Sequence, residues 1–95
     1  EVTQSSDRWT FRMYYNSVLF YEGYVLFDGT AGEFTYYSDG TTVIATASWS
    51  TAVDGQITFV YEFDPYTVTV VTNSDGSAGT YTFSDGSSTA TYTWP

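Results

Sequence analysis

Apolar and polar residues alternate along most of this chain. The stretch RWTFRMYY (8–15) places Trp, Phe and Met at every second position, with Thr and Arg between them. ITFVYEF (57–63) and TATYTW (89–94) show the same alternation. Successive side chains of a strand point to opposite faces of a sheet, so this period predicts strands with one apolar and one polar face. No window shows a convincing helical period.

Short turn signals separate these stretches. Asp-Gly occurs at 28–29, 39–40, 54–55, 75–76 and 85–86. Asp-Gly is a strong hairpin signal because its residues tolerate positive φ. Asn16-Ser17 and Asp64-Pro65-Tyr66 supply two more turns. Seven turns predict eight strands, at about 8–15, 18–27, 31–38, 41–50, 56–63, 66–73, 78–83 and 87–94.

Two segments of the chain have nearly the same sequence. Residues 28–42 read DGTAGEFTYYSDGTT, and residues 75–88 read DGSAGTYTFSDGSS. Trp49 then corresponds to Trp94, which predicts half-repeats at about 8–49 and 56–94 of four strands each. Four strands with one apolar face cannot bury it alone, whereas two such units can close around a shared interior. We therefore predict one domain, residues 1–95.

The expected fold is all-β: an eight-stranded antiparallel up-and-down β-barrel with a pseudo-twofold 4+4 strand repeat. Closure removes exposed edges, and Gly23, Gly32 and Gly79 would provide the kinks that tight curvature needs. A two-sheet β-sandwich is the alternative. The residues expected to fill the interior or line a ligand cavity are Trp9, Phe11, Met13, Phe59, Tyr61, Phe63, Tyr81 and Trp94.

The composition restricts the function. The chain is 42% hydrophobic and 21% aromatic, which argues against disorder. Its net charge of −9 repels nucleic acid and anionic membranes. His and Cys are absent, so the commonest general base and thiol nucleophile are missing, and we expect no enzymatic activity and no cofactor. Glu22 is expected to pair with Arg12 across the first hairpin.

Two loops contain several oxygen-bearing side chains. NSDGS (73–77) and SDGSS (84–88) carry the hard ligands that Ca²⁺ prefers. Hairpin geometry already explains Asp-Gly at both places, and no EF-hand spacing is present. We therefore predict no metal site.

Several apolar residues of the first three strands depart from the alternation. They are Tyr14, Phe20, Tyr24, Leu26 and Tyr37. On the polar face they would form an exposed patch of the kind that contacts a partner or ligand. The alternative is that the alternation slips at a bulge and these residues belong to the interior.

Two resemblances support a barrel. Trp9 at the start of the first strand, beside Arg8, resembles the opening of lipocalin (calycin) barrels, although the usual Gly two residues before Trp is missing. YVLFDGTAGEFTYY also resembles a hairpin of small bacterial lipocalin-like domains, which implies a barrel able to hold an apolar ligand. The regular Asp-Gly hairpins and the absence of Lys, His and Cys resemble de novo designed β-barrels instead.

Three functions follow as expectations. The first is a non-catalytic scaffold or binding module holding a small apolar ligand in the barrel. The second is a small transmembrane β-barrel, which requires the barrel to be inverted so that aromatic residues face lipid. The third is a protein-interaction or assembly subunit using the Tyr-rich patch. A natural chain of this kind is expected outside the cell or in the periplasm, and a designed one has no such location.

Overall fold

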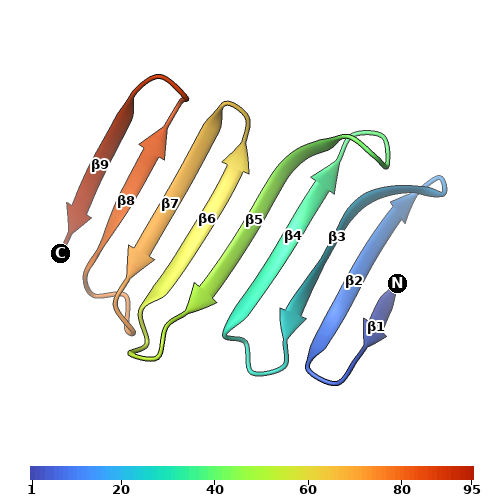
Figure 1. Ribbon diagram of the computed structural model, residues 1–95, viewed down its shortest axis with the longest axis horizontal. Helices are drawn as coiled ribbons and strands as arrows, with labels where there is room; N and C mark the ends of the chain where they lie inside the picture. The colour runs from blue at the N-terminus through green and yellow to red at the C-terminus, as the bar shows by residue number, and fades with distance from the viewer.

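The computed structural model describes residues 1–95 and is all-β, as predicted (Figure 1). Each strand pairs antiparallel with its neighbours in the chain, so the sheet order is β1 to β9 without a crossover. The strands are β1 (Val2–Gln4), β2 (Arg8–Tyr15), β3 (Val18–Leu26), β4 (Ala31–Tyr37), β5 (Val43–Thr51), β6 (Ile57–Phe63), β7 (Tyr66–Thr72), β8 (Gly79–Ser84) and β9 (Thr89–Trp94). The predicted antiparallel meander is therefore confirmed.

Sequence reasoning missed one strand. The eight predicted strands correspond to β2–β9, each within two residues at either end. β1 pairs Val2 with Phe11 and Gln4 with Trp9. Three residues are too few for alternation to reveal a strand. The N-terminus adds a further anchor, because its amino group donates to the Arg12 carbonyl at 2.7 Å.

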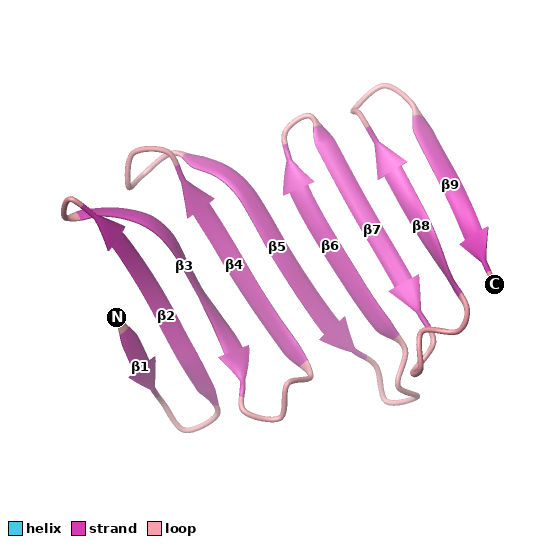
Figure 2. Ribbon diagram, turned by 180° about the vertical axis from the view of Figure 1, so that it is seen from behind, coloured by secondary structure: helices cyan, strands magenta, loops and turns pink.

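The predicted closed barrel is wrong. β1 and β9 lie at opposite edges of one open sheet, and no strand joins them (Figures 1 and 2). The molecule measures 44 × 36 × 14 Å, which is the thickness of a single layer. The two-sheet sandwich is also absent within this chain. The residues expected to line an interior therefore lie on an open surface.

The positions of the β-bulges give a physical reason for the open sheet. The ladder shifts register between Met13 and Tyr14, opposite Phe20, and again between Tyr36 and Tyr37. The four ladders from β5 to β9 run without a shift. Bulges bend strands and are the usual device for curling a sheet into a barrel. The second half of this sheet lacks them, and its edge stays far from β1.

Almost nothing in the molecule is fully buried. Ala45, at 6% exposure, is the one buried hydrophobic residue, and Gly32 is the other buried position. A typical domain covers the apolar face of a sheet with a second layer. Here the apolar side chains are covered only by their neighbours on the same sheet.

The turns behave as their sequences predict. Gly29, Gly40, Gly55, Gly76 and Gly86 all have positive φ. The Asp carboxylates accept hydrogen bonds from backbone N–H groups two or three residues later, as at Thr30, Thr41 and Thr42. These carboxylates therefore act as turn caps, which accounts for their frequency.

Candidate functional site: an aromatic sheet face

The strand register gathers most of the aromatic side chains on one side of the sheet. Phe11 lies opposite Gly23, Gly23 opposite Phe34, and Phe34 opposite Ala47. We call this side the aromatic face. It comprises Trp9, Phe11, Met13, Tyr21, Val25, Phe34, Tyr36, Ala45, Ala47, Trp49, Ile57, Phe59, Tyr61, Phe63, Tyr66, Val68, Val70, Tyr81, Phe83, Ala90, Tyr92 and Trp94.

Aromatic rings contact one another across neighbouring strands of this face. The Phe34 ring is central: its centroid lies 6.0 Å from that of Phe11, 6.0 Å from that of Tyr21 and 6.3 Å from that of Trp49. In the second half, Tyr81 and Tyr92 lie 6.3 Å apart. Such ring pairs contribute about 0.5–1.5 kcal/mol beyond area burial. The rings thus stabilise the sheet in the absence of a second layer.

Two tryptophans lie flat over glycines in equivalent places. A Cβ atom at Gly32 would overlap the Trp49 ring, and one at Gly79 would overlap the Trp94 ring. Trp49 Nε1 donates to the Gly29 carbonyl at 3.2 Å, and Trp94 Nε1 donates to the Gly76 carbonyl at 3.0 Å. This correspondence extends the predicted half-repeat to specific side-chain contacts. Gly32 and Gly79 thus leave space for an indole ring, whereas the sequence predicts that they kink the strands.

The aromatic face carries no charged side chain. The seven Asp residues lie between strands, while Arg12, Glu22, Glu33 and Glu62 occupy the other side. The apolar side chains are nonetheless open to water: Phe59 is 38% exposed, Phe63 45% and Tyr92 65%. Monomeric proteins rarely expose so large a continuous apolar area.

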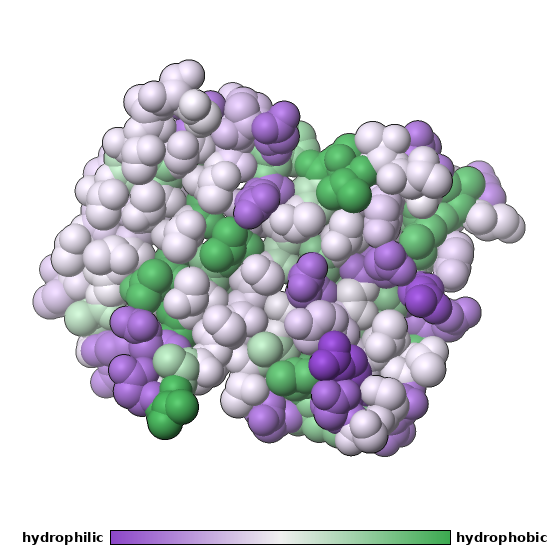
Figure 3. All heavy atoms as spheres, in the orientation of Figure 1, coloured by the Kyte–Doolittle hydropathy of each residue, from purple (hydrophilic) through white to green (hydrophobic).

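The opposite side, which we call the polar face, is rich in hydroxyl groups. It includes Thr10, Arg12, Glu22, Tyr24, Glu33, Thr35, Ser48, Thr58, Glu62, Thr69, Thr82 and Thr91. The side seen in Figure 3 shows hydrophobic residues as separate spots among near-neutral and hydrophilic ones. Thr is a common choice for exposed strand positions because it suits a pleated surface.

A small network of charged groups lies on the polar face. Arg12 Nε donates to Glu22 Oε2 at 3.2 Å, which confirms the predicted pair. A two-residue turn alone would set Arg12 opposite Tyr21, and the bulge at Phe20 shifts the register to Glu22. Tyr37 Oη donates to Glu22 Oε1 at 2.7 Å. The hydrogen bond from Tyr37 lowers the pKa of Glu22 most, and the bond from Arg12 lowers it further. The hydrogen bond to Glu22 raises the pKa of Tyr37.

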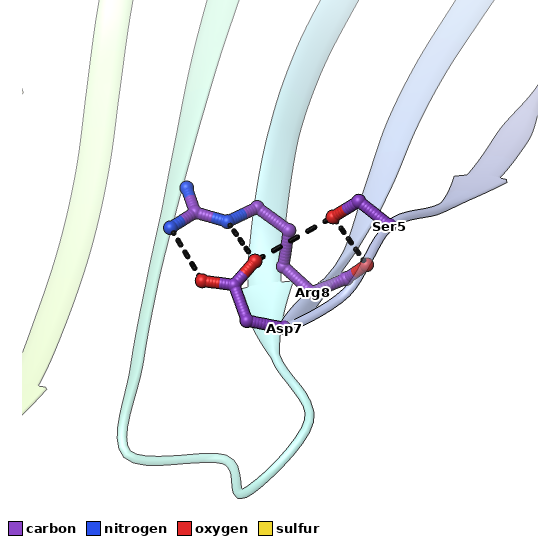
Figure 4. Close-up of polar contacts among 3 residues, drawn as sticks. All are labelled: Ser5, Asp7 and Arg8. Atoms are coloured by element: carbon purple, nitrogen blue, oxygen red, sulfur yellow. Dashed lines mark hydrogen bonds and ion pairs between the residues drawn. The ribbon is translucent and has the colours of Figure 1, made fainter.

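The turn before β2 holds the other arginine. Arg8 Nε and Nη2 donate to the two carboxylate oxygens of Asp7 at 3.0 and 3.2 Å, and Ser5 Oγ donates to Asp7 Oδ1 at 3.5 Å (Figure 4). The bond from Arg8 lowers the pKa of Asp7. The Arg8 guanidinium also lies 4.3 Å from the centre of the Tyr24 ring. Both arginines are therefore engaged by residues of the chain.

Four of the five residues of the predicted interaction patch, Tyr14, Tyr24, Leu26 and Tyr37, follow the polar-face alternation of their strands. Tyr24 lies under Arg8, Tyr37 bonds Glu22, and Leu26 is half-buried opposite Arg8. Tyr14 lies beside the first hairpin, and the Phe20 ring contacts Tyr21 at 5.1 Å. No ring pair joins two of these five residues.

The molecular surface has several open hollows. The largest, about 400 Å³, lies between the 52–56 and 73–78 loops and is lined by residues such as Asp54, Asn73 and Thr80. A second, about 380 Å³, lies beside Tyr15, Phe20 and Asp39. No group of three or more acidic side chains is arranged to hold a metal ion. No helix of the structure could cross a membrane.

No family model, curated protein or solved structure matches this chain. The surface that stands out is the aromatic face. Sequence reasoning named eight of its residues but missed central ones such as Tyr21, Phe34, Tyr36 and Trp49. The alternation in AGEFTYY (31–37) contains that signal, since Gly32, Phe34 and Tyr36 share a face.

Proposed function

We propose that this chain is a non-catalytic interaction module whose binding surface is the aromatic face. The observation that carries the proposal is a face without charge that extends over β2–β9 and remains open to solvent. Tyr, Trp and Phe are the residue types enriched in protein interfaces, and charged residues are depleted from interface centres. The module acts by placing this face against an apolar layer of a partner.

The open sheet favours a broad binding partner over a small ligand. Residues expected to surround a small apolar ligand, such as Phe11, Phe59 and Trp94, share one open face but lie on strands β2, β6 and β9, which do not adjoin. A small molecule bound there would be covered on one side, whereas ligand pockets bury most of their ligand. A broad flat layer matches the shape of the face better, so we place the interaction-module function first.

The test combines a neutral dye with a mass measurement. Nile red is titrated into dilute protein while light scattering reports the mass. A face without a partner takes up dye saturably, and a covered face gives a mass above 10.6 kDa. At concentrations where the chain is monomeric, Phe59→Glu is expected to reduce dye uptake. Thr58→Glu, on the same strand but on the polar face, is the matched control and is expected to retain it.

A chain of 10.6 kDa that takes up no dye at any concentration would overturn the proposal. Equal losses in the two Glu variants would also contradict it, because dye uptake would then not depend on the aromatic face.

A further inference from the structure

We infer that the layer covering the aromatic face is a second copy of this chain, so that two sheets pack face to face as a symmetric β-sandwich. This inference rests on the proposed function and names its partner. Three features of the molecule support it: the area it exposes, the placement of its charges and the flatness of its aromatic face.

The exposed area exceeds that of a folded monomer by about the amount one interface covers. A compact protein of this mass exposes about 5,500 Å², whereas this chain exposes 6263 Å². The difference, roughly 800 Å², equals one partner's share of a standard protein interface. The radius of gyration is 15.4 Å, against about 12 Å for a compact chain of this length. Face-to-face pairing would cover this excess of exposed area.

The charged side chains lie away from the surface that this pairing would bury. Two copies carry −9 each, and close approach of the acids would oppose association. Stacking the aromatic faces keeps every carboxylate at the turns or on the outer surfaces. Stacking the polar faces would bring Glu33 and Glu62 of one copy toward those of the other. The charge pattern therefore selects the aromatic face for self-association.

The same pattern disfavours a lipid surface as the occupant. Peripheral proteins commonly add basic residues around an apolar face to attract anionic headgroups. This aromatic face has none, and both arginines lie toward the polar face in contact with acids. A second copy presents an uncharged, equally apolar layer.

The shape of the aromatic face suits another sheet. Trp49 and Trp94 lie flat over Gly32 and Gly79, and the Phe34 ring lies against Gly23. Rings that fill the space above glycines leave a smoother layer than upright rings over bulky neighbours. Sheets stack about 10 Å apart with interdigitating side chains. β5 is the middle strand of nine, so Trp49 and its neighbour Phe59 would lie midway between the two edges of the paired sheets.

Sedimentation velocity over a range of concentrations tests the pairing. We expect a species of twice 10.6 kDa that does not grow further with concentration. Phe59→Glu should weaken the dimer at least about 30-fold, the effect of losing a central interface residue. Thr58→Glu should change its dissociation constant by less than about threefold, as for surface substitutions elsewhere. Circular dichroism checks that each variant keeps its strands.

A second substitution guards against unfolding of the Phe59 variant. Tyr92 is the most exposed aromatic residue of the aromatic face, so Tyr92→Glu is expected to leave the fold intact while weakening the dimer. Thr91→Glu, the adjacent residue on the polar face, is its control.

The outcomes separate this inference from the proposed function. A monomer that takes up Nile red through the aromatic face overturns the second copy and leaves the interaction module standing. Binding of that monomer to zwitterionic phosphatidylcholine vesicles identifies lipid as the occupant and also overturns the inference that a second copy covers the face. A monomer with no dye uptake overturns both proposals. Dimers that persist in Phe59→Glu and Tyr92→Glu but are lost in Thr58→Glu use another surface and contradict the inference.

Discussion

The half formed by β2–β5 and the half formed by β6–β9 share a tryptophan–glycine contact and differ in their polar face. Both end with an indole ring over a glycine, through Trp49 and Trp94. In the first half, Arg12 pairs with Glu22, whereas the corresponding pair in the second half is Val60 and Thr69. What recurs between the halves is therefore what builds the sheet and its aromatic face. The residues of the polar face can differ between the halves because water forms hydrogen bonds with whichever polar groups are present there.

The backbone differs as well. The first half contains both bulges and the turn Asn16-Ser17, in which both residues have positive φ. The second half has unbroken ladders and turns at a cis Asp64-Pro65 bond. Equivalent side-chain contacts thus occur on two backbones of different regularity. Paired substitutions at matched positions measure how far the equivalence extends.

The largest expected difference comes from the glycines under the tryptophans. The atoms nearest to a Cβ in Gly32→Ala all belong to the Trp49 ring, which can lift. Gly79→Ala meets the Val71 carbonyl oxygen of the backbone as well as the Trp94 ring. We expect about 1–3 kcal/mol of destabilisation for each, with Gly79→Ala the more costly. Urea unfolding of both variants measures this, and a smaller loss at Gly79 would show that the edge strand β9 relaxes freely.

The tryptophan hydrogen bonds should give a smaller effect. Trp49→Phe and Trp94→Phe each remove one indole N–H bond to a turn carbonyl, at a cost of about 1 kcal/mol. Trp49 lies in the middle strand and Trp94 in the edge strand, so Trp49→Phe is expected to cost more. Thermal unfolding of both variants compares them. Equal losses would mean that the hydrogen bond, rather than the packing of the ring, determines the effect.

Acid should destabilise the first half's turn at Asp39 more than its counterpart at Asp85. Backbone N–H groups of Thr42 and Thr41 lower the pKa of Asp39 to about 2, and those of Ser88 and Ser87 lower the pKa of Asp85. A carboxylate with a depressed pKa stabilises the fold above its unfolded value of 3.8, and this stability disappears as pH falls toward 2. Asn keeps an acceptor oxygen but does not titrate.

We therefore expect Asp39→Asn to reduce the loss of stability between pH 4 and 2 by more than Asp85→Asn does. Urea midpoints measured across this range for the wild-type chain and both variants provide the comparison. Identical pH profiles for all three proteins would contradict the assignment.

The smallest expected effect concerns the polar face. Glu22→Gln removes the charge that Arg12 contacts, whereas Thr69→Ala changes the equivalent position of the second half. Exposed ion pairs contribute little and are screened by salt. The midpoint of the wild-type chain should fall slightly as salt rises, and this part of the salt dependence should vanish in Glu22→Gln alone. A large loss of stability in Glu22→Gln at high salt would show that the network has a structural role beyond its charge.

Much of the local structure could be predicted from particular residues. The alternation in RWTFRMYY predicted both β2 and its apolar side, and the Asp-Gly pairs predicted most turns. The likeness of residues 28–42 to 75–88 predicted that Trp49 corresponds to Trp94, but their contacts with glycine were not foreseen. β1 was not found, because a three-residue strand is too short to show a period. A kink was expected at Gly23, whereas the irregularity lies at Phe20. A bulge depends on how two strands fit together and not on one residue type.

What the sequence by itself determined is eight of the nine strands, their order and the face of the side chains in the regularly alternating strands. These features depend on neighbours in the chain and on a period of two. Only the tertiary structure decided that the sheet stays open, because closure depends on curvature summed over nine strands and on whether β1 and β9 meet. The residues expected inside a barrel therefore form an exposed aromatic face.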